Sequence, residues 1–274
     1  MLSRLGEEFG PRSEREPAPV YGENRPIPPQ SYRLSLPTGP ARAIWVILAL
    51  NIAIYVIPTV LQLAGVRIGG SLINDYVLNA GAKDNDKILN GQYYRFLTSM
   101  FLHLGLIHVG VNCYSLYAIG PQTERFYGTL RFLALYFISG LSGGVASYLL
   151  NASPGVGASG AIFGLVGGLA AFYYSSRKLL GDISRQQLGS LITVIMINLF
   201  IGLSSGGLID NYAHMGGLVG GAVVGWLLAP RLELDERLYS PQIARRWLAF
   251  AWPGTLAFLA LLVFLVTTIS PPIR

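Results

Sequence analysis

A serine and a histidine, Ser159 and His214, stand at the starts of two long apolar segments of the sequence. A serine hydroxyl becomes an effective nucleophile when a base lies within hydrogen-bond reach, and a neutral imidazole is such a base. Polar side chains inside a membrane are costly, so each needs a structural or functional reason. The two residues are therefore a candidate catalytic pair, although a single serine in a membrane helix more often bonds to its own backbone.

Glycines at every fourth position follow both residues. Such a stripe leaves one side of a helix smooth, so that the backbone of another helix can approach closely. We therefore expect the two helices to be neighbours, with Ser159 and His214 at similar depth because both helices begin on the same side of the membrane. The pattern also fits helix packing without catalysis. The glycines are Gly160, Gly164 and Gly168 in one segment and Gly217, Gly221 and Gly225 in the other.

His108 and Asn112 are four residues apart in the stretch HVGVN, which puts both side chains on one face of a helix. With the backbone N–H of Ser159 at a helix N-terminus, they form a candidate oxyanion hole for a tetrahedral intermediate. The alternative is an ordinary hydrogen-bonded contact between helices. Asp210, one turn before His214, could orient the imidazole. Because it lies at the outer edge of its segment, we favour a Ser–His dyad over a triad.

Metal and cofactor chemistry has little support in the sequence. The three histidines, His103, His108 and His214, are dispersed, no HExxH motif is present, and Cys113 is the only cysteine. Zinc sites draw on clustered histidine, cysteine or carboxylate ligands. We therefore expect neither a metal site nor another cofactor.

The composition is that of a membrane protein. Of the 274 residues, 52% are hydrophobic and only 12% are charged, and the mean hydropathy is +0.48. Soluble domains carry about 25% charged residues. Seven apolar runs each fit the roughly 17 to 25 residues that a helix needs to cross a bilayer, and they predict an all-α polytopic fold. The runs are Ala43–Gly65, Phe96–Gly120, Phe132–Leu150, Val156–Tyr174, Leu188–Ser204, Asn211–Ala229 and Ala249–Ile269.

The lysines and arginines predict the orientation. With the N-terminus inside, 15 of the 20 fall in inner segments, so we expect a cytoplasmic N-terminus and an outer C-terminus. The net charge of +6 does not indicate nucleic-acid binding, because the cations lie in short loops between apolar runs. The predicted organisation is a disordered tail at 1–42, a six-helix core at 43–229, a cytoplasmic connector at 230–248, and a seventh helix with the C-terminus at 249–274.

Three motifs in combination resemble those of the rhomboid family of intramembrane serine proteases, and the match covers roughly Ile44–Ala229. The resemblance implies that Ser159 is the nucleophile and His214 the base, and that His108 and Asn112 line the oxyanion hole. The motifs are GASG at Gly157–Gly160, AHMGGLVGG at Ala213–Gly221 and HLGLIHVGVN at His103–Asn112.

Further positions resemble the family pattern with small departures. Phe163 stands where the family commonly has a tyrosine stacked on the catalytic histidine, so the ring is kept and the hydroxyl is lost. Tyr94 and Arg95 stand in place of a Trp-Arg pair in the first loop. The resemblance implies that His103 is structural.

The resemblance implies a six-helix fold around a water-filled cavity that opens to the outside, with one extra C-terminal helix. Gly157 and Gly160 would leave room for a substrate backbone, and Gly120 and Glu124 are similar to the family's structural GxxxE. The implied reaction is hydrolysis of a peptide bond in or near the transmembrane segment of a membrane-anchored protein. The alternatives are an inactive chaperone or scaffold of the same fold and a small-solute transporter, for which no internal repeat is evident.

Overall fold

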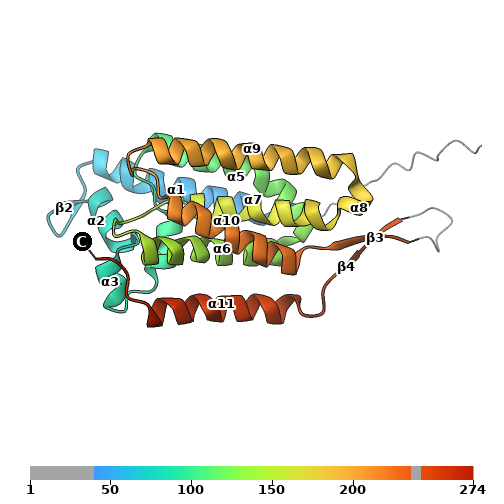
Figure 1. The fold of residues 1–274 in the computed structure, drawn as a ribbon. Coiled ribbons are helices and arrows are strands. Elements are labelled where there is room, and N and C mark those ends of the chain that lie inside the picture. The colour runs from blue at the N-terminus through green and yellow to red at the C-terminus, as the bar shows by residue number, and fades with distance from the viewer. Residues whose placement is uncertain (1–39, 236–241, 274) are drawn as a thin grey trace, which may run out of the picture. The chain divides into compact units, whose positions relative to one another are not determined.

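Seven long helices make up most of the part of the chain that the computed structural model describes, residues 40–235 and 242–273. Each corresponds to one of the apolar runs, so the predicted all-α polytopic fold is confirmed (Figure 1). The predicted disordered tail lies outside the described residues, apart from 40–42. The helices are α1 (Ala43–Leu63), α5 (Leu106–Tyr127), α6 (Thr129–Leu150), α7 (Ser159–Ser175), α9 (Asp182–Ser204), α10 (Asn211–Leu228) and α11 (Ala251–Thr268).

Shorter elements connect them, namely β1 (Arg67–Ile68), β2 (Ser71–Leu72), α2 (Ile73–Gly81), α3 (Asn85–Leu89), α4 (Arg95–Thr98), η1 (Ser99–Phe101), α8 (Arg177–Leu180), β3 (Arg231–Asp235) and β4 (Gln242–Arg246). Strands β1 and β2 form one antiparallel hairpin. The predicted connector forms a second, in which Arg231 pairs with Arg246. Helices α2 and α3 lie at the same end of the helices as the C-terminus, and β3 and β4 lie at the other end (Figure 1).

The second apolar run, Phe96–Gly120, does not form the one continuous helix that its length predicts. The chain forms α4 and η1, passes through extended backbone at Leu102 and Gly105, and then begins α5 at an angle of 93° to the preceding helical segment. The carbonyl of Ser99 accepts a hydrogen bond of 2.9 Å from the N–H of Gly157, which ties η1 to a distant loop. Hydropathy does not detect this break because the residues on both sides of it are apolar.

The chain is an integral membrane protein with several spans. Within the described residues, α1, α6, α9 and α11 are long and apolar enough to cross a bilayer, and the bent pair of Arg95–Phe101 and α5 would make a fifth span. Helices α7 and α10 are not among these, so length and hydropathy support fewer spans than the seven predicted. Helix α7 has only 17 residues, of which 13 are buried, so little of its surface is left to face lipid.

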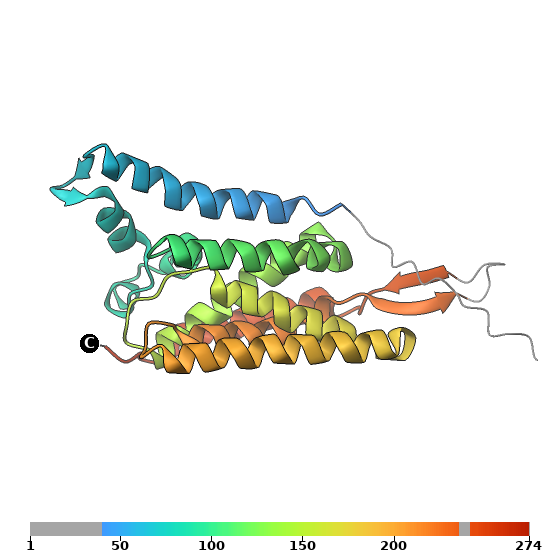
Figure 2. The same cartoon turned by 90° about the horizontal axis from the view of Figure 1, so that it is seen from above.

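Helix α7 is central to the packing and contacts α5, α6, α9 and α10, while α1 and α9 lie on opposite sides (Figure 2). Its contact with α10 is made backbone to backbone. A Cβ atom added to Gly217 would overlap the carbonyl oxygen of Gly160, and one added to Gly221 would overlap the backbone of Gly164. We call this contact the glycine seam, and it confirms that the two glycine-striped helices are neighbours.

Helix α6 is a third member of this close packing. A Cβ atom added to Gly143 would lie 2.6 Å from the carbonyl oxygen of Ala213 and 3.3 Å from the Cα of Gly160. The hydroxyl of Ser142 donates to the carbonyl of Gly216 at 2.9 Å. Small side chains on α6 therefore allow it to lie against both helices of the glycine seam.

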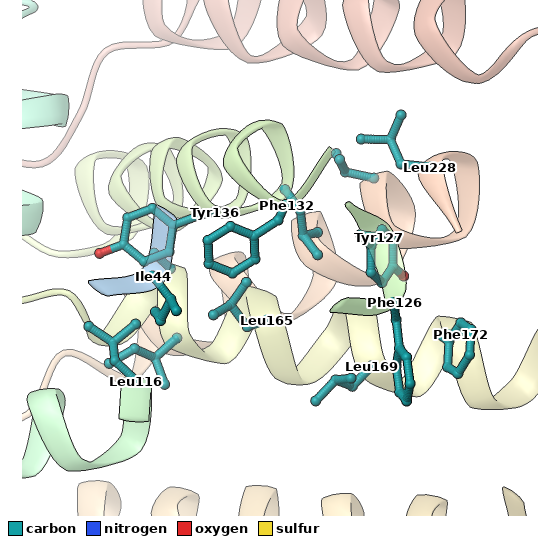
Figure 3. Close-up of a cluster of buried hydrophobic side chains, with 14 of the residues drawn as sticks. Ile44, Leu116, Phe126, Tyr127, Phe132, Tyr136, Leu165, Leu169, Phe172 and Leu228 are labelled. Carbon is teal, nitrogen blue, oxygen red and sulfur yellow. The ribbon is translucent and has the colours of Figure 1, made fainter. Parts of the chain in front are cut away.

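Aromatic and aliphatic side chains, mainly from α1, α5, α6, α7 and α10, form the main hydrophobic core (Figure 3). Phe126 stacks on Phe172 with 4.2 Å between ring centroids. Tyr127 is fully buried, and its hydroxyl lies 2.7 Å from the carbonyl oxygen of Gly168 and 3.0 Å from that of Gly225. Tyr127 thus holds α7 and α10 together far along the seam from Ser159.

Glu124 fixes the start of α1. Its side chain is fully buried, and its carboxylate accepts the hydroxyl of Thr129 at 2.8 Å and three backbone N–H groups. An anionic acceptor at a helix N-terminus accepts hydrogen bonds from N–H groups that have no intrahelical partner, and its charge interacts favourably with the helix dipole. Gly120, one turn earlier, leaves room for the side chain of Ile44. The three backbone donors are the N–H groups of Arg42, Ala43 and Ile44, each at 3.0 Å.

Replacing Gly217 with alanine will destabilise the protein, because the added methyl group overlaps the carbonyl oxygen of Gly160. Overpacking of this kind costs about 1–3 kcal/mol, so the thermal unfolding midpoint in detergent will fall by several degrees. Gly189→Ala is the matched control, since that glycine is also helical but nothing lies within 4 Å of an added Cβ. Its midpoint will be unchanged or raised. Equal midpoints for the two variants would contradict the glycine seam.

Candidate active site

Ser159 is the first residue of α7, and Gly157 shapes the chain before it. Gly157 has a φ of +129°, which residues with a side chain rarely adopt, and its N–H donates to Ser99. Ala158 then has helical φ and ψ angles of −73° and −5°. The first N–H groups of a helix lack intrahelical acceptors. The start of α7 therefore places backbone donors beside the Ser159 hydroxyl.

His214 lies in the first turn of α10. Its Nε2 is 2.9 Å from the Oγ of Ser159, which is hydrogen-bond distance. The residue is only 9% exposed, and its ring stacks on that of Phe163, with 4.4 Å between centroids and 12° between planes. The structure thus brings the two predicted catalytic residues together across the glycine seam, with Phe163 beside them.

The carboxylate of Asp210 is engaged elsewhere. One oxygen accepts the N–H of Ala213 at 3.1 Å and so caps α10, and the other accepts the hydroxyl of Ser147 at 2.5 Å. The Nδ1 atom of His214 is buried and has no hydrogen-bond partner among the described residues. The arrangement is therefore a serine and a histidine without a carboxylate on the imidazole.

The structure brings His108 and Asn112 to the site in different ways. His108 borders the loop before the serine, since a Cβ atom added to Gly157 would lie 2.7 Å from its Nε2. Asn112 is 4% exposed, and its Nδ2 donates to the carbonyl of His108 at 2.8 Å. Its Oδ1 is buried and has no partner in the described part of the chain. Because an amide has two N–H hydrogens, the bond to His108 leaves a second hydrogen for another acceptor.

The remaining predicted residues support the site from a distance. His103 is buried and meets the ring of His108 edge to face, with centroids 5.1 Å apart. Gly160 lies in the glycine seam. Arg95 is 3% exposed, and its guanidinium donates to the side chain of Gln92 and to two main-chain carbonyls at the end of α2 and just after it. Arg95 therefore holds together residues 79–95 of the segment between α1 and α5, and it makes no hydrogen bond to the Ser–His pair.

Sequence reasoning missed Lys83. This residue is 2% exposed, and its ammonium donates to the main-chain carbonyls of Asn151 and Ser153, in the loop that leads to Ser159. Lysines are almost never fully buried unless they are paired, so a loop lysine is normally assumed to be exposed. No sequence signal marks these partners, because every residue has a main-chain carbonyl.

The site brings together a hydroxyl, an imidazole and several N–H donors, which are the groups used in acyl transfer. Among the described residues, no three His, Cys, Asp or Glu side chains form a group that could hold a metal ion. An open, mostly apolar pocket of about 340 Å³ lies apart from the Ser–His pair, between α1 and α2. It is lined by Ile54, Tyr76, Val77, Ala80, Gly81, Thr98, Phe101 and Leu102.

Comparison with known proteins finds one family match, to the Rhomboid domain, over residues 90–231. The Rhomboid protease GluP of Bacillus subtilis (strain 168) is 40% identical over 154 residues, which cover 56% of this chain and 29% of that protein. RHOMBOID-like protein 9, chloroplastic, of Arabidopsis thaliana is 35% identical over 156 residues, 57% of this chain and 36% of that protein. RHOMBOID-like protein 6, mitochondrial, of the same plant is 37% identical over 173 residues, which cover 61% of this chain and 54% of that protein. The matched region therefore spans between 29% and 54% of the length of these relatives.

Proposed function

Because the chain belongs to the rhomboid family, we propose that it is an intramembrane serine endopeptidase in which Ser159 is the nucleophile and His214 the base. The observation that carries the proposal is the 2.9 Å contact between His214 Nε2 and Ser159 Oγ at the start of two closely packed helices. The protease name of the Bacillus relative supports it. The proposed substrates are membrane-anchored proteins, cleaved within or next to their transmembrane segments.

The proposed reaction uses the imidazole twice. Nε2 of His214 accepts the hydroxyl proton while Oγ of Ser159 bonds to the carbonyl carbon of the scissile peptide. Nε2 can accept only when it carries no proton, so the resting ring holds its hydrogen on Nδ1. The imidazolium then donates the proton to the leaving amine as the C–N bond breaks. A water molecule, deprotonated by the same nitrogen, hydrolyses the ester and restores Ser159. The stacked ring of Phe163 fixes the orientation of the imidazole, the task that a carboxylate performs in a catalytic triad.

The proposed oxyanion hole has three donors: the backbone N–H of Ser159, Nε2–H of His108 and the second amide hydrogen of Asn112. A long contact of 3.5 Å from the N–H of Leu104 to Nδ1 of His108 favours the tautomer with its hydrogen on Nε2. That nitrogen is the one that borders Gly157. Donors held in place before the reaction stabilise the oxyanion without reorganisation at the moment of reaction.

Ser159→Ala and His214→Ala will each lower cleavage of a transmembrane substrate in proteoliposomes by about a thousand-fold or more, and the double variant will be no worse than either single one. Asp210→Asn will stay near the wild-type rate, since asparagine caps a helix as well as aspartate does. Covalent labelling by a fluorophosphonate probe will occur in the wild type and not in Ser159→Ala. Cleavage by Ser159→Ala would refute the assignment of the nucleophile. A folded wild type that neither labels nor cleaves would favour an inactive scaffold of the same fold.

Asn112→Ala will slow turnover by about a hundred- to a thousand-fold, the usual effect of removing one oxyanion donor. The Ser159 hydroxyl will still react with the small probe. His108→Ala will be slower still, because His108 also packs against Gly157 and His103. Asn198→Ala is the matched control, since Asn198 makes the same bond of 2.8 Å to the carbonyl four residues earlier, but on α9. Wild-type turnover in both site variants would mean that the two residues only join helices.

The proposed topology has a cytoplasmic N-terminus and a site that opens to the outer side, as the lysine and arginine counts favour. In a variant without Cys113, a cysteine at Arg67 will react with an impermeant maleimide from outside intact cells. A cysteine at Arg185, near the start of α9, will react only after permeabilisation, and its side chain is 88% exposed, so burial does not limit the reaction. The reverse pattern would invert the topology.

A further inference from the structure

We propose that Lys83 is a positioning residue for Ser159. It acts through residues 151–158, which join α6 to α7 and which we call the serine loop. The inference rests on the proposed catalytic role of Ser159. Lys83 lies between α2 and α3, far from Ser159 in the sequence. It is one of the largest fully buried side chains of the described residues, at 2% exposure. A buried ammonium is costly unless it is hydrogen-bonded. The groups that receive its hydrogen bonds therefore indicate its role.

Lys83 holds the loop with its side chain and its backbone together. Its Nζ donates to the carbonyl of Asn151 at 2.6 Å and to that of Ser153 at 3.0 Å. Its backbone forms an antiparallel bridge with Gly155, from Lys83 N–H to the Gly155 carbonyl at 2.9 Å and from Gly155 N–H to the Lys83 carbonyl at 3.0 Å. Two of these bonds are donated by the side-chain nitrogen, so they form only if the side chain is fully inserted.

The loop leads directly from these bonds to the nucleophile. Gly155 is four residues before Ser159, and between them the N–H of Gly157 is held by the carbonyl of Ser99. Residues 151, 153, 155 and 157 are each hydrogen-bonded to the segment between α1 and α5. The residues between them are neighbours of these in the sequence. Because this segment belongs to no helix or strand, these external bonds determine where α7 begins, and hence where the Ser159 hydroxyl and N–H lie relative to His214.

Asn85 extends the same network to the C-terminal segment. Its Nδ2 lies 2.6 Å from the carbonyl oxygen of Pro272 and 3.2 Å from those of Tyr148 and Asn151. An amide with two hydrogens cannot fully satisfy three acceptors, and the shortest contact goes to Pro272. The Asn151 carbonyl lies within hydrogen-bond distance of both Lys83 Nζ and Asn85 Nδ2. The segment after α11 thus contacts the elements that hold the serine loop.

Stability alone does not explain this arrangement. Replacing a buried charge by an apolar group of similar volume is often neutral or stabilising, and methionine would fill the same space. What methionine cannot supply is directed hydrogen bonds to the carbonyls of Asn151 and Ser153, so the loop would keep its packing and lose its fixed position. A small displacement of a reacting group costs much more in rate than in stability.

The test compares Lys83→Met with Lys87→Met in full-length protein reconstituted in proteoliposomes. Lys87 lies on α3 in the same region, but its side chain contacts Asp84 and Asn79 and not the serine loop. Each variant is assayed below its own melting temperature for kcat and KM on a transmembrane substrate, and for the rate of fluorophosphonate labelling of Ser159. We expect Lys83→Met to lower kcat and the labelling rate by about 10- to 100-fold with KM nearly unchanged. Lys87→Met will match the wild type.

A folded Lys83→Met variant with the wild-type labelling rate overturns the proposal, as does an equal loss in Lys87→Met. If Lys83→Met does not fold, Lys83→Gln decides the matter, because its amide can still donate a hydrogen bond but its side chain is too short to reach both the Asn151 and the Ser153 carbonyls. Its labelling rate must then fall while the protein stays folded, and an unchanged rate overturns the proposal. Absence of labelling in the wild type would instead contradict the proposed function, so the two failures are distinguishable.

Discussion

The backbone-to-backbone contact between α7 and α10 is the constraint on which the rest of the structure depends. Helices that pack through larger side chains have axes about 8–10 Å apart, whereas the backbone contact here lets even the short side chain of Ser159 reach the facing helix. Because Gly217 and Gly221 lie against Gly160 and Gly164 without intervening side chains, the two polar groups meet at 2.9 Å. Helix α6 joins the contact from a third side through Gly143. The central helices α7 and α10 are therefore held by close packing and bury many of their residues, whereas α1 and α9 bury few.

The buried polar residues divide into two kinds by what they bond to. Glu124, Tyr127 and Ser142 satisfy main-chain groups of other helices, and each of them has a structural task that a buried polar group can perform without a ligand. The contact between Ser159 and His214 joins two side chains and satisfies no main-chain group, and the Nδ1 atom of His214 has no partner among the described residues. The pair therefore differs from the structural polar residues in bonding side chain to side chain and to no backbone group.

The helices, the glycine seam and the pairing of Ser159 with His214 could be predicted because each leaves a periodic or spaced signal in the sequence. The break before α5 could not, since apolar residues flank it and the hydrogen bond that ties η1 in place comes from the distant Gly157. The same reason hid Lys83, whose partners are main-chain carbonyls. The hairpin of β3 and β4 was predicted only as a charged connector, although RLELD alternates polar and apolar residues, because two charged strands of five residues give only a short signal. What the sequence conceals is thus mostly long-range bonding to the backbone.

Helix α11 contributes to the site without approaching the Ser–His pair. Its Leu262 packs with Ile88 of α3, Phe96 of α4 and Tyr148 of α6 in a hydrophobic cluster separate from the main core. Because Ile88 and Phe96 belong to the segment between α1 and α5, α11 packs against the part of the chain that carries Lys83 and Arg95. Helix α9, by contrast, buries only two of its residues. The surroundings of the Ser–His pair are therefore unequal, because the side formed by α6, α10 and α11 is closely packed and the side formed by α9 is not. A rearrangement of α9 would break far fewer contacts than one of α6, so the closely packed side is the one that can keep the serine loop in place while a substrate binds.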